Sequence, residues 1–419
     1  MAAAKATATA SFSDLSYKIT KIISKEEKQN NGIYFTPPKT VIRCIELLAG
    51  AATTTFNNIL EPSCGSCEFI EKIKDCYPDA TISGVEYNKD IYENIKDIYN
   101  NNAKIKIIEG DFLKTGFANA PKFDLIIGNP PYYVMKKGDV KSEYYDYFDG
   151  RPNIFLLFII KSLRLLTDDG ILCFILPKSF LNCLYYNKTR KYIYDNYSIL
   201  SILECDDKYI DTEQPTIIFI IRKGSSAASA DENAKYILGH LKNEYTIFST
   251  SEVIERLNGL YVGATTLNAL QFKVSVGSIV WNQHKAALTD DPQKTRLIYS
   301  QDIKDNTLSI KEYTNTAKKN YINKSGFKEP LLVINRGYGV GNYNFEYALI
   351  NCDEQEAIKE YLIENHLICI RCEATTAADK YIQIYKSFGD KRTLEFIKLY
   401  FGNNAINTTE LLNILPIYL

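Results

Sequence analysis

From residue 58 onward, short runs of apolar and β-branched residues alternate with stretches of helical periodicity. The strand-like runs cover residues 58–61, 81–86, 105–109, 125–128, 171–176, 199–203 and 216–222. The helical patterns between them cover residues 68–76, 89–100, 154–166 and 179–196. Strands that alternate with helices of this length are typical of a parallel sheet covered on both faces. The pattern therefore predicts an α/β fold with a doubly wound, mostly parallel sheet of seven strands.

The alternation is lost after residues 224–230, whose Gly, Ser and Ala composition is typical of a flexible linker. Short mixed segments with turn residues follow, and helical patterns close the chain at 393–401 and 409–415. Residues 1–30 are polar apart from a short helical pattern at 12–24, and an amphipathic helix is predicted at 39–48. We expect a flexible N-terminal segment (1–30), a first domain (31–223), the linker (224–230) and a mixed α+β second domain (231–419).

The composition of the chain indicates the cellular compartment of the protein but says little about any reaction that it catalyses. Hydrophobic residues make up 46% and charged residues 24% of the chain, as in soluble globular proteins. We find neither an apolar run of the roughly 18 residues that a transmembrane helix needs nor the apolar core of a signal peptide. The ten cysteines lack framework spacing, which favours the cytoplasm or another reducing intracellular compartment. Cys64-x-x-Cys67 and Cys369-x-x-Cys372 lie too far apart for a zinc ribbon, so we expect no metal.

The formal net charge of −1 is spread evenly, so a nucleic-acid-binding face would have to be local. The best candidate is the stretch 311–328, where Glu312 is the one acidic residue among five lysines. A solvated loop explains this run about as well as phosphate contacts do.

The stretch that carries the chemistry runs from Phe123 to Tyr132, with the sequence FDLIIGNPPY. The apolar run reads as a buried strand that Gly128 ends. Two prolines then remove two backbone N–H donors and leave carbonyl acceptors, with the Asn129 amide beside them. The Asn129 side-chain oxygen and the Pro130 carbonyl could each accept one N–H of an exocyclic amine. This would free the nitrogen lone pair for methylation. Read alone, the tetrapeptide 129–132 is more simply a Pro-Pro turn after a strand.

Three further segments follow strands of the predicted sheet, where parallel sheets bind ligands. Residues 61–67 follow the first strand and open a helix. Glu86 ends the second strand, where a carboxylate can bond both hydroxyls of a ribose. Asp111 and Phe112 follow the third strand, in position to meet the edge of an adenine. A Gly-containing loop alone is weak evidence, but this ordered series favours a nucleoside-containing cofactor.

With these pieces in order, the chain resembles the gamma-class, amino-group-specific DNA methyltransferases that modify adenine N6. Residues 34–38 (YFTPP) resemble that family's N-terminal cofactor motif, and residues 59–69 the loop around the methionine moiety. Residues 84–86 are similar to its ribose-binding motif, 110–112 to its adenine-contacting motif, and 129–132 to its catalytic loop. The resemblance continues through 153–166 and 170–177 and covers most of the chain from Tyr34 onward.

The resemblance implies the class I S-adenosylmethionine-dependent methyltransferase fold, with S-adenosylmethionine as the cofactor and no metal. Its adenine would lie between Tyr87 and Phe158, for which ordinary core packing is the alternative. The implied cofactor-binding residues are Thr36, Pro37, Glu61, Ser63, Gly65, Glu86, Tyr87, Asp111, Phe112 and Phe158. The implied catalytic residues are Asn129, Pro130, Tyr132 and Tyr209, the last stacking on an extruded base. One departure is Cys67, which stands where the family often has a glycine.

The second domain looks like the family's target-recognition domain, which implies double-stranded DNA as a partner and a separate cognate restriction endonuclease beside it. Several of its residues have side chains of the types that contact base edges or phosphates. They are Trp281, Asn282, Gln283, Lys285, Arg296, Arg336 and Tyr338. A structural role is the alternative for each. About 30 residues precede the first motif, too few for a fused nuclease, so we expect a stand-alone modification enzyme.

Two other functions stay open at this point. The first is methylation of another amine, in RNA or in a protein glutamine. Protein glutamine methyltransferases share the Asn-Pro-Pro-Tyr loop but lack a second domain of this size. The second is a non-catalytic DNA-binding specificity subunit, which the intact loop 129–132 and Glu86 argue against.

Overall fold

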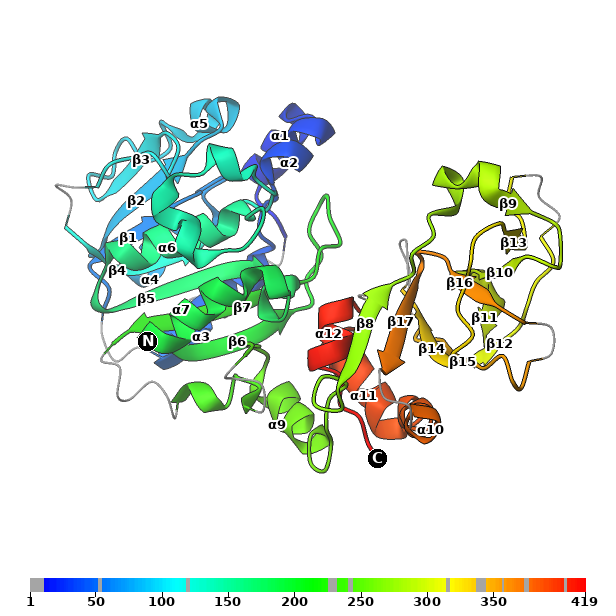
Figure 1. Ribbon diagram of the computed structural model, residues 1–419. Helices are drawn as coiled ribbons and strands as arrows, with labels where there is room; N and C mark the ends of the chain where they lie inside the picture. Colours follow the sequence, from blue (N-terminus) through cyan, green and yellow to red (C-terminus); the bar gives the residue numbers. More distant parts are fainter. Residues whose placement is uncertain are drawn as a thin grey trace. The chain divides into compact units, whose positions relative to one another are not determined.

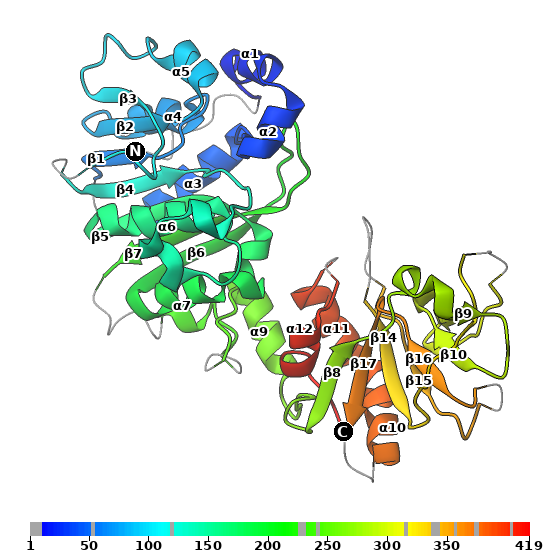
Figure 2. The ribbon, with the colours of Figure 1, turned by 45° about the horizontal axis from the view of Figure 1, so that its top comes forward.

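The computed structural model describes residues 11–51, 55–117, 121–224, 232–239, 244–313, 317–336, 344–355, 358–372, 377–402 and 405–419. The chain divides into two compact units, Met1–Glu255 and Arg256–Leu419. Figure 1 and Figure 2 show the elements of both.

The described residues of the first unit build a seven-stranded sheet with the order β3-β2-β1-β4-β5-β7-β6. The strands are β1 (Asn58–Glu61), β2 (Thr81–Glu86), β3 (Ile105–Glu109), β4 (Phe123–Gly128), β5 (Leu166–Pro177), β6 (Tyr197–Cys205) and β7 (Thr216–Lys223). Neighbours among β1 to β5 run parallel, and β7 runs antiparallel to β5 and β6. This confirms the doubly wound, mostly parallel sheet and the class I S-adenosylmethionine-dependent methyltransferase fold.

Side chains alternate between the two faces along each strand and build a core on each side. Leu125 and Ile127 of β4 join one core with α3 (Pro38–Ala51), α4 (Glu68–Cys76) and α5 (Lys89–Ile95). Ile126 joins the other core with α6 (Ile154–Leu165) and α7 (Asn187–Asn196), which lie in front of the sheet in Figure 1. Two shorter helices, α1 (Asp14–Ile22) and α2 (Lys25–Asn31), precede α3. The helices therefore cover both faces, as the strand pattern predicted.

The predicted helix at 179–196 is wrong in its first half. Residues 178–186 form the 3₁₀ turns η4 (Lys178–Leu181) and η5 (Leu184–Tyr186) instead. The cause is Arg190, which is fully buried and donates to the carbonyls of Phe180 (2.9 Å) and Cys183 (2.8 Å). It also donates to the carbonyl of Thr246, far along the chain. The buried guanidinium needs acceptors, and the 3₁₀ turns present the carbonyls of Phe180 and Cys183 to it, which a regular α-helix would use within its own ladder.

The boundary between the units lies later than the linker composition predicted. Most of the expected linker, residues 225–230, lies outside the described residues. The segment after it packs on the first unit. The Ile199 N–H donates to the Asn233 side chain (2.6 Å), and the Phe248 N–H to the Leu181 carbonyl (2.8 Å). The division therefore falls after Glu255, inside α9 (Ser251–Leu260).

The second unit is the mixed α+β domain that the sequence predicted. Its described residues form four-stranded sheets with the orders β15-β14-β17-β8 and β16-β10-β13-β9, and the hairpin β11-β12. The strands are β8 (Phe272–Val276), β9 (Leu288–Thr289), β10 (Thr295–Ile298), β11 (Ile303–Lys304), β12 (Thr307–Leu308), β13 (Tyr321–Ile322), β14 (Leu331–Asn335), β15 (Tyr347–Ile350), β16 (Tyr361–Ile363) and β17 (Leu367–Cys372). The helices are α10 (Ala377–Phe388), α11 (Lys391–Tyr400) and α12 (Thr408–Asn413). The last two match the predicted closing helices approximately.

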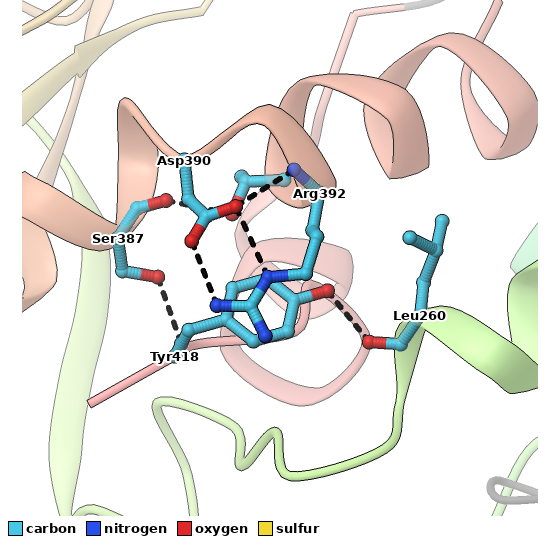
Figure 3. A network of polar contacts seen from close by, with 6 residues as sticks. Leu260, Ser387, Asp390, Arg392 and Tyr418 are labelled. Carbon is cyan, nitrogen blue, oxygen red and sulfur yellow. Dashed lines mark hydrogen bonds and ion pairs between the residues drawn. The ribbon is translucent and has the colours of Figure 1, made fainter.

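Tyr418, beside the C-terminus, joins α9 to the closing helices of the second unit (Figure 3). Its hydroxyl donates to the Leu260 carbonyl (2.6 Å), and its backbone N–H donates to the Ser387 hydroxyl (2.9 Å). The Arg392 guanidinium, held by Asp390, lies 3.7 Å from the centre of the Tyr418 ring. Within the described ranges we find no helix that is long and apolar enough to span a bilayer.

Candidate active site

A cavity of about 340 Å³ opens in the first unit at the carboxyl ends of β1, β2, β3 and β4. The order of the strands reverses between β1 and β4, and open α/β sheets bind ligands at such a switch point. The residues of its wall are Asn31, Gly32, Ile33, Tyr34, Phe35, Pro62, Ser63, Gly65, Glu86, Tyr87, Asn88, Ile91, Asp111, Phe112, Leu113, Lys114, Asn129, Pro131, Tyr133, Met135, Asp139, Val140, Lys141, Tyr144, Ile154, Leu157 and Phe158. The cavity therefore brings together most of the sequence-predicted cofactor residues and the Asn129 side chain.

Glu86 lines the cavity as the last residue of β2, and it is only 6% exposed. Its two carboxylate oxygens accept the Gly65 N–H (2.9 Å) and the Asn88 N–H (2.7 Å). Burial raises the pKa of Glu86 to about 7, although these backbone donors oppose the effect. Each oxygen keeps a lone pair for a further donor, such as a hydroxyl group. Backbone donors thus fix the Glu86 carboxylate at the cavity wall, and its contact with a ribose stays a prediction.

The loop between β1 and α4 passes Glu86 with two residues in the left-handed region. Gly65 has φ +50°, and Cys67, the N-cap residue directly before α4, has φ +64°. A non-glycine residue is strained there. The Cys67 side chain is fully buried, and the Cys64 thiol donates to it. That hydrogen bond and burial raise the pKa of Cys64. Apolar packing and this contact offset the strain.

Aromatic rings flank the part of the cavity where an adenine was predicted. Tyr87 is 67% exposed, whereas Phe158 on α6 is nearly covered. The Phe158 ring packs against that of Phe112, with 5.0 Å between the ring centroids. Asp111 lines the same wall, and one of its oxygens accepts the Leu113 N–H (2.9 Å). Phe112 and Phe158 therefore serve both the core and the cavity wall.

The Asn129 side chain is held from two directions. Its amide nitrogen donates to the Tyr34 carbonyl (3.2 Å), and its amide oxygen accepts from the Tyr132 hydroxyl (2.6 Å). The Ser63 hydroxyl donates to the Asn129 backbone carbonyl (3.1 Å). These contacts fix the plane of the amide and place its oxygen on the side of Tyr132. The Ile175 carbonyl, 2.8 Å from the Tyr132 hydroxyl, is a second acceptor for the same proton.

Several predicted residues do not belong to the cavity wall. The wall just described does not include Thr36, Pro37, Glu61, Pro130 or Tyr132. The Tyr132 ring packs against the core, edge-on to Phe155, so its hydroxyl rather than its face acts on the site. Glu61 is 2% exposed, and burial, with smaller contributions from Cys67 and Glu86, raises the pKa of its carboxyl group.

Tyr209 lies outside the cavity wall in this structure. It is 8% exposed, its hydroxyl donates to Thr216 (3.4 Å), and burial raises its pKa. Two contacts hold its loop: the Thr40 hydroxyl donates to Asp207 (2.8 Å), and Lys28 pairs with Asp211 (2.8 Å). The predicted stacking face is therefore packed against protein.

Sequence reasoning missed several wall residues. Ile154 and Leu157 lie on the same face of α6 as the predicted Phe158, which helical periodicity could have shown. Tyr34 acts through its backbone carbonyl, for which its side chain gives no signal. Within the described parts of the chain we find no group of three or more His, Cys, Asp or Glu side chains placed to hold a metal.

In the second unit, the structure brings together part of the predicted DNA-binding set. Trp281 and Asn282 lie in η7 (Trp281–Gln283) and Lys285 begins η8 (Lys285–Ala287), directly before β9. Trp281 packs against an apolar cluster, while Asn282 and Lys285 are exposed. Arg336 follows β14 of the other sheet, and Tyr338 lies outside the described residues.

Comparison with known proteins shows the family to which this chain belongs. Residues 42–210 match the family model described as Eco57I restriction-modification methylase. The chain is 30% identical over 406 residues to the type II methyltransferase M.CvrRI of Paramecium bursaria Chlorella virus XZ-6E, covering 94% of this chain and 96% of the relative. The chain belongs to this family of type II restriction–modification methyltransferases.

Two further comparisons complete the picture. The modification methylase CviBIII of Paramecium bursaria Chlorella virus NC1A is 26% identical to this methyltransferase over 414 residues, covering 97% of this chain and 99% of the relative. A crystal structure of a type I restriction–modification system methyltransferase subunit from Streptococcus thermophilus has a TM-score of 0.40 and 17% identity, covering 55% of this chain and 53% of that one.

Proposed function

We propose that this methyltransferase transfers a methyl group from S-adenosylmethionine to the N6 amino group of adenine in double-stranded DNA. The observation that carries the proposal is the Asn129 amide, which is held by Tyr34 and Tyr132 and lines the same cavity as the Glu86 carboxylate. One side chain suits the acceptor amine and the other suits the cofactor. Their common cavity supports a reaction between the two ligands.

The residues present fit S-adenosylmethionine. The buried Glu86 carboxylate has lone pairs for both ribose hydroxyls. Tyr87 and Phe158 offer aromatic faces for the adenine ring, and Asp111 offers an acceptor for its amine. When bound, the cofactor supplies an electrophilic methyl group on a positively charged sulfur.

Asn129 and Pro130 would activate the acceptor. The lone pair of an adenine amine is delocalised into the ring, so the nitrogen is a weak nucleophile. Asn129 keeps one lone pair beside the bond from Tyr132 and can accept one N–H of the amine. The carbonyl of Pro130 adjoins Pro131 in the cavity wall and can accept the other. Two such bonds draw the nitrogen toward tetrahedral geometry and localise its lone pair.

The target adenine must leave the duplex to reach this cavity. Inside the helix its amine is paired and stacked, and extrusion costs a few kcal/mol. Stacking on an aromatic side chain returns roughly 1–3 kcal/mol. In the structure Tyr34, Phe35 and Tyr133 line the cavity, so one of these three rings, rather than Tyr209, is our candidate for the stacking partner. With 2-aminopurine at the target position, binding should raise its fluorescence.

A methyl-transfer assay with labelled S-adenosylmethionine and duplex DNA, RNA or protein as acceptor tests the proposal. We expect label in duplex DNA alone. Asn129→Ala should remove more than 95% of this transfer, because the amide acts on the acceptor amine. The affinity of this variant for the cofactor should stay within a few-fold of the wild-type affinity. This unchanged affinity is the control that shows the variant to be folded. Label in RNA or in protein glutamine would contradict the proposed acceptor, and a wild type that binds DNA without transferring label would be a specificity subunit.

The setting of the reaction belongs to the same proposal. We infer that the protein is the modification enzyme beside a separate endonuclease, and that it acts in a reducing intracellular compartment. The proposal would be supported if an endonuclease copurified with the protein and cleaved unmethylated DNA but not DNA that the protein had methylated.

A further inference from the structure

One edge of the sheet β16-β10-β13-β9 gathers residues from three separate segments. β10 and β16 run parallel, so both begin at this edge. β13 runs antiparallel to β10 and β9, so it ends here and β9 begins here. The residues before β16, before β10 and after β13 therefore meet, although they lie far apart in the sequence.

These segments surround a polar cavity of about 490 Å³ and place four lysines around it. We call Lys294, Lys324, Lys328 and Lys359 the lysine edge, and all four are exposed. Among the described residues that line the cavity, the one carboxylate is Glu360. One of its oxygens already accepts the Thr295 hydroxyl (2.8 Å) and the Gly326 N–H (3.1 Å). The lysine edge therefore has an excess of positive charge.

Arg296 also lines this cavity and is only 3% exposed. Its guanidinium donates to the Lys311 carbonyl (2.9 Å) and lies 5.1 Å from the centre of the Tyr321 ring. In the described part of the chain its Nε is buried and has no hydrogen-bond partner. A buried donor without an acceptor is costly, and the charge of this guanidinium adds to the positive charge of the cavity wall.

The lysine edge adjoins the segment that the sequence analysis selected for DNA contacts. The Asn323 N–H donates to the Ala287 carbonyl (2.8 Å), and the Lys324 ammonium lies 3.4 Å from Nδ1 of His284. Asn282 and Lys285 are exposed in this same segment. Side chains that could read base edges thus lie next to exposed lysines. In protein–DNA interfaces, phosphate contacts position the protein and base contacts specify the site.

We propose that the lysine edge binds backbone phosphates of duplex DNA and sets the position of the second unit on the duplex. The proposal rests on the proposed function, because it takes DNA as the substrate. It extends that function by separating phosphate contacts, made by the lysine edge, from sequence reading. The basic run at 311–328 contributes only in part: Lys324 and Lys328 belong to the edge, whereas Lys319 pairs with Asp290.

The test is the salt dependence of duplex binding by full-length protein in the presence of S-adenosylhomocysteine. The variant carries Lys294→Gln and Lys359→Gln, two exposed positions outside the 311–328 run. The matched control carries Lys380→Gln and Lys398→Gln, exposed on α10 and α11 of the same unit. Each phosphate contact contributes about 0.9 to the slope of log K against log salt. We expect the variant's slope to be shallower than that of the wild type by about two, and the control's slope to be unchanged.

Two duplexes, with and without the methylated site, separate the roles. Loss of affinity should be equal on both, because phosphates carry no sequence information. A variant that binds duplex DNA with the wild-type affinity and slope overturns the lysine edge and leaves the proposed function intact. If the variant lost affinity only for the duplex that contains the site, or only for duplex RNA, the lysine edge would not bind DNA phosphates. A wild type that binds no duplex DNA overturns both proposals.

Discussion

Replacement of Glu86 by glutamine should make the protein more stable at high pH and weaken cofactor binding at the same time. Burial raises the pKa of Glu86 from 4.5 to about 7. A carboxyl whose folded-state pKa is raised contributes stability that is fully present below its unfolded pKa. That stability is lost as the pH rises through about 7. Glutamine cannot ionise, so the Glu86→Gln variant escapes this loss.

The magnitude follows from the two pKa values. Each pKa unit corresponds to about 1.4 kcal/mol, so ionisation of Glu86 should cost the wild type about 2–3 kcal/mol between about pH 5 and pH 8. The advantage of Glu86→Gln should grow by that amount over the same interval. The cofactor shows the opposite effect: each lost charge-assisted bond to a ribose hydroxyl is worth about 1.5–3 kcal/mol. The affinity for S-adenosylmethionine should fall at least about tenfold.

Urea unfolding of the cofactor-free protein at about pH 5 and pH 8, followed by circular dichroism, measures the first effect. The transition to compare is the one that S-adenosylhomocysteine shifts, because that transition belongs to the first unit. Glu109→Gln is the matched control, since Glu109 pairs in register with Glu86 on β3 but is exposed. Stability curves of Glu86→Gln and wild type that stay parallel across this pH range would refute the reasoning, as would an unchanged cofactor affinity.

Three further substitutions separate the supporting roles. Tyr132→Phe removes the hydroxyl that holds the Asn129 amide. It should lower kcat about tenfold with little change in KM for DNA, whereas near-normal kcat would mean that only the ring matters. Tyr209→Ala should lower the free energy of unfolding by about 3–5 kcal/mol, because its ring is buried; unchanged stability in urea would point to an exposed ring. Arg190→Met should cost on the order of 3–5 kcal/mol, because carbonyls of Phe180, Cys183 and Thr246 lose a charged donor, and calorimetry showing a near-normal melting temperature would contradict this.

The sheet could be predicted because its signals are local. The expected bounds of β1, β2 and β3 agree with the structure, since each is a short apolar run between turn residues. The prediction of a helix at 179–196 was wrong in its first half, where the Arg190 guanidinium donates to the carbonyls of Phe180 and of the distant Thr246. A contact of that kind depends on the folded chain and leaves no periodic pattern.

The domain boundary illustrates a different limit. A Gly, Ser and Ala segment indicates where the chain bends freely, but not which unit holds the residues after it. Asn233 and Phe248 follow that segment and still pack on the first unit. Their partners at Ile199 and Leu181 are separated from them by more chain than any local pattern covers.

The candidate site could be predicted as far as side chains reveal it. Glu86, Gly65 and Asp111 meet in one cavity because each follows a neighbouring parallel strand, and strand ends are readable from sequence. The two hydrogen bonds that fix the Asn129 side chain could not be predicted. One is made to the backbone carbonyl of Tyr34, and the other requires the Tyr132 hydroxyl, rather than its ring face, to point toward Asn129. The burial of Tyr209 depends in turn on the ties of its loop to Thr40 and Lys28.

Long-read sequencing of the genome of an expression host that produces the protein tests the central claim most directly, because it reports the modified base and its context together. The Asn129→Ala variant in the same host is the control. We predict N6-methyladenine at one recurring sequence in the host with the wild-type protein and none at that sequence in the control. Methylation of cytosine instead, or adenine methylation that persists in the Asn129→Ala host, would contradict the account.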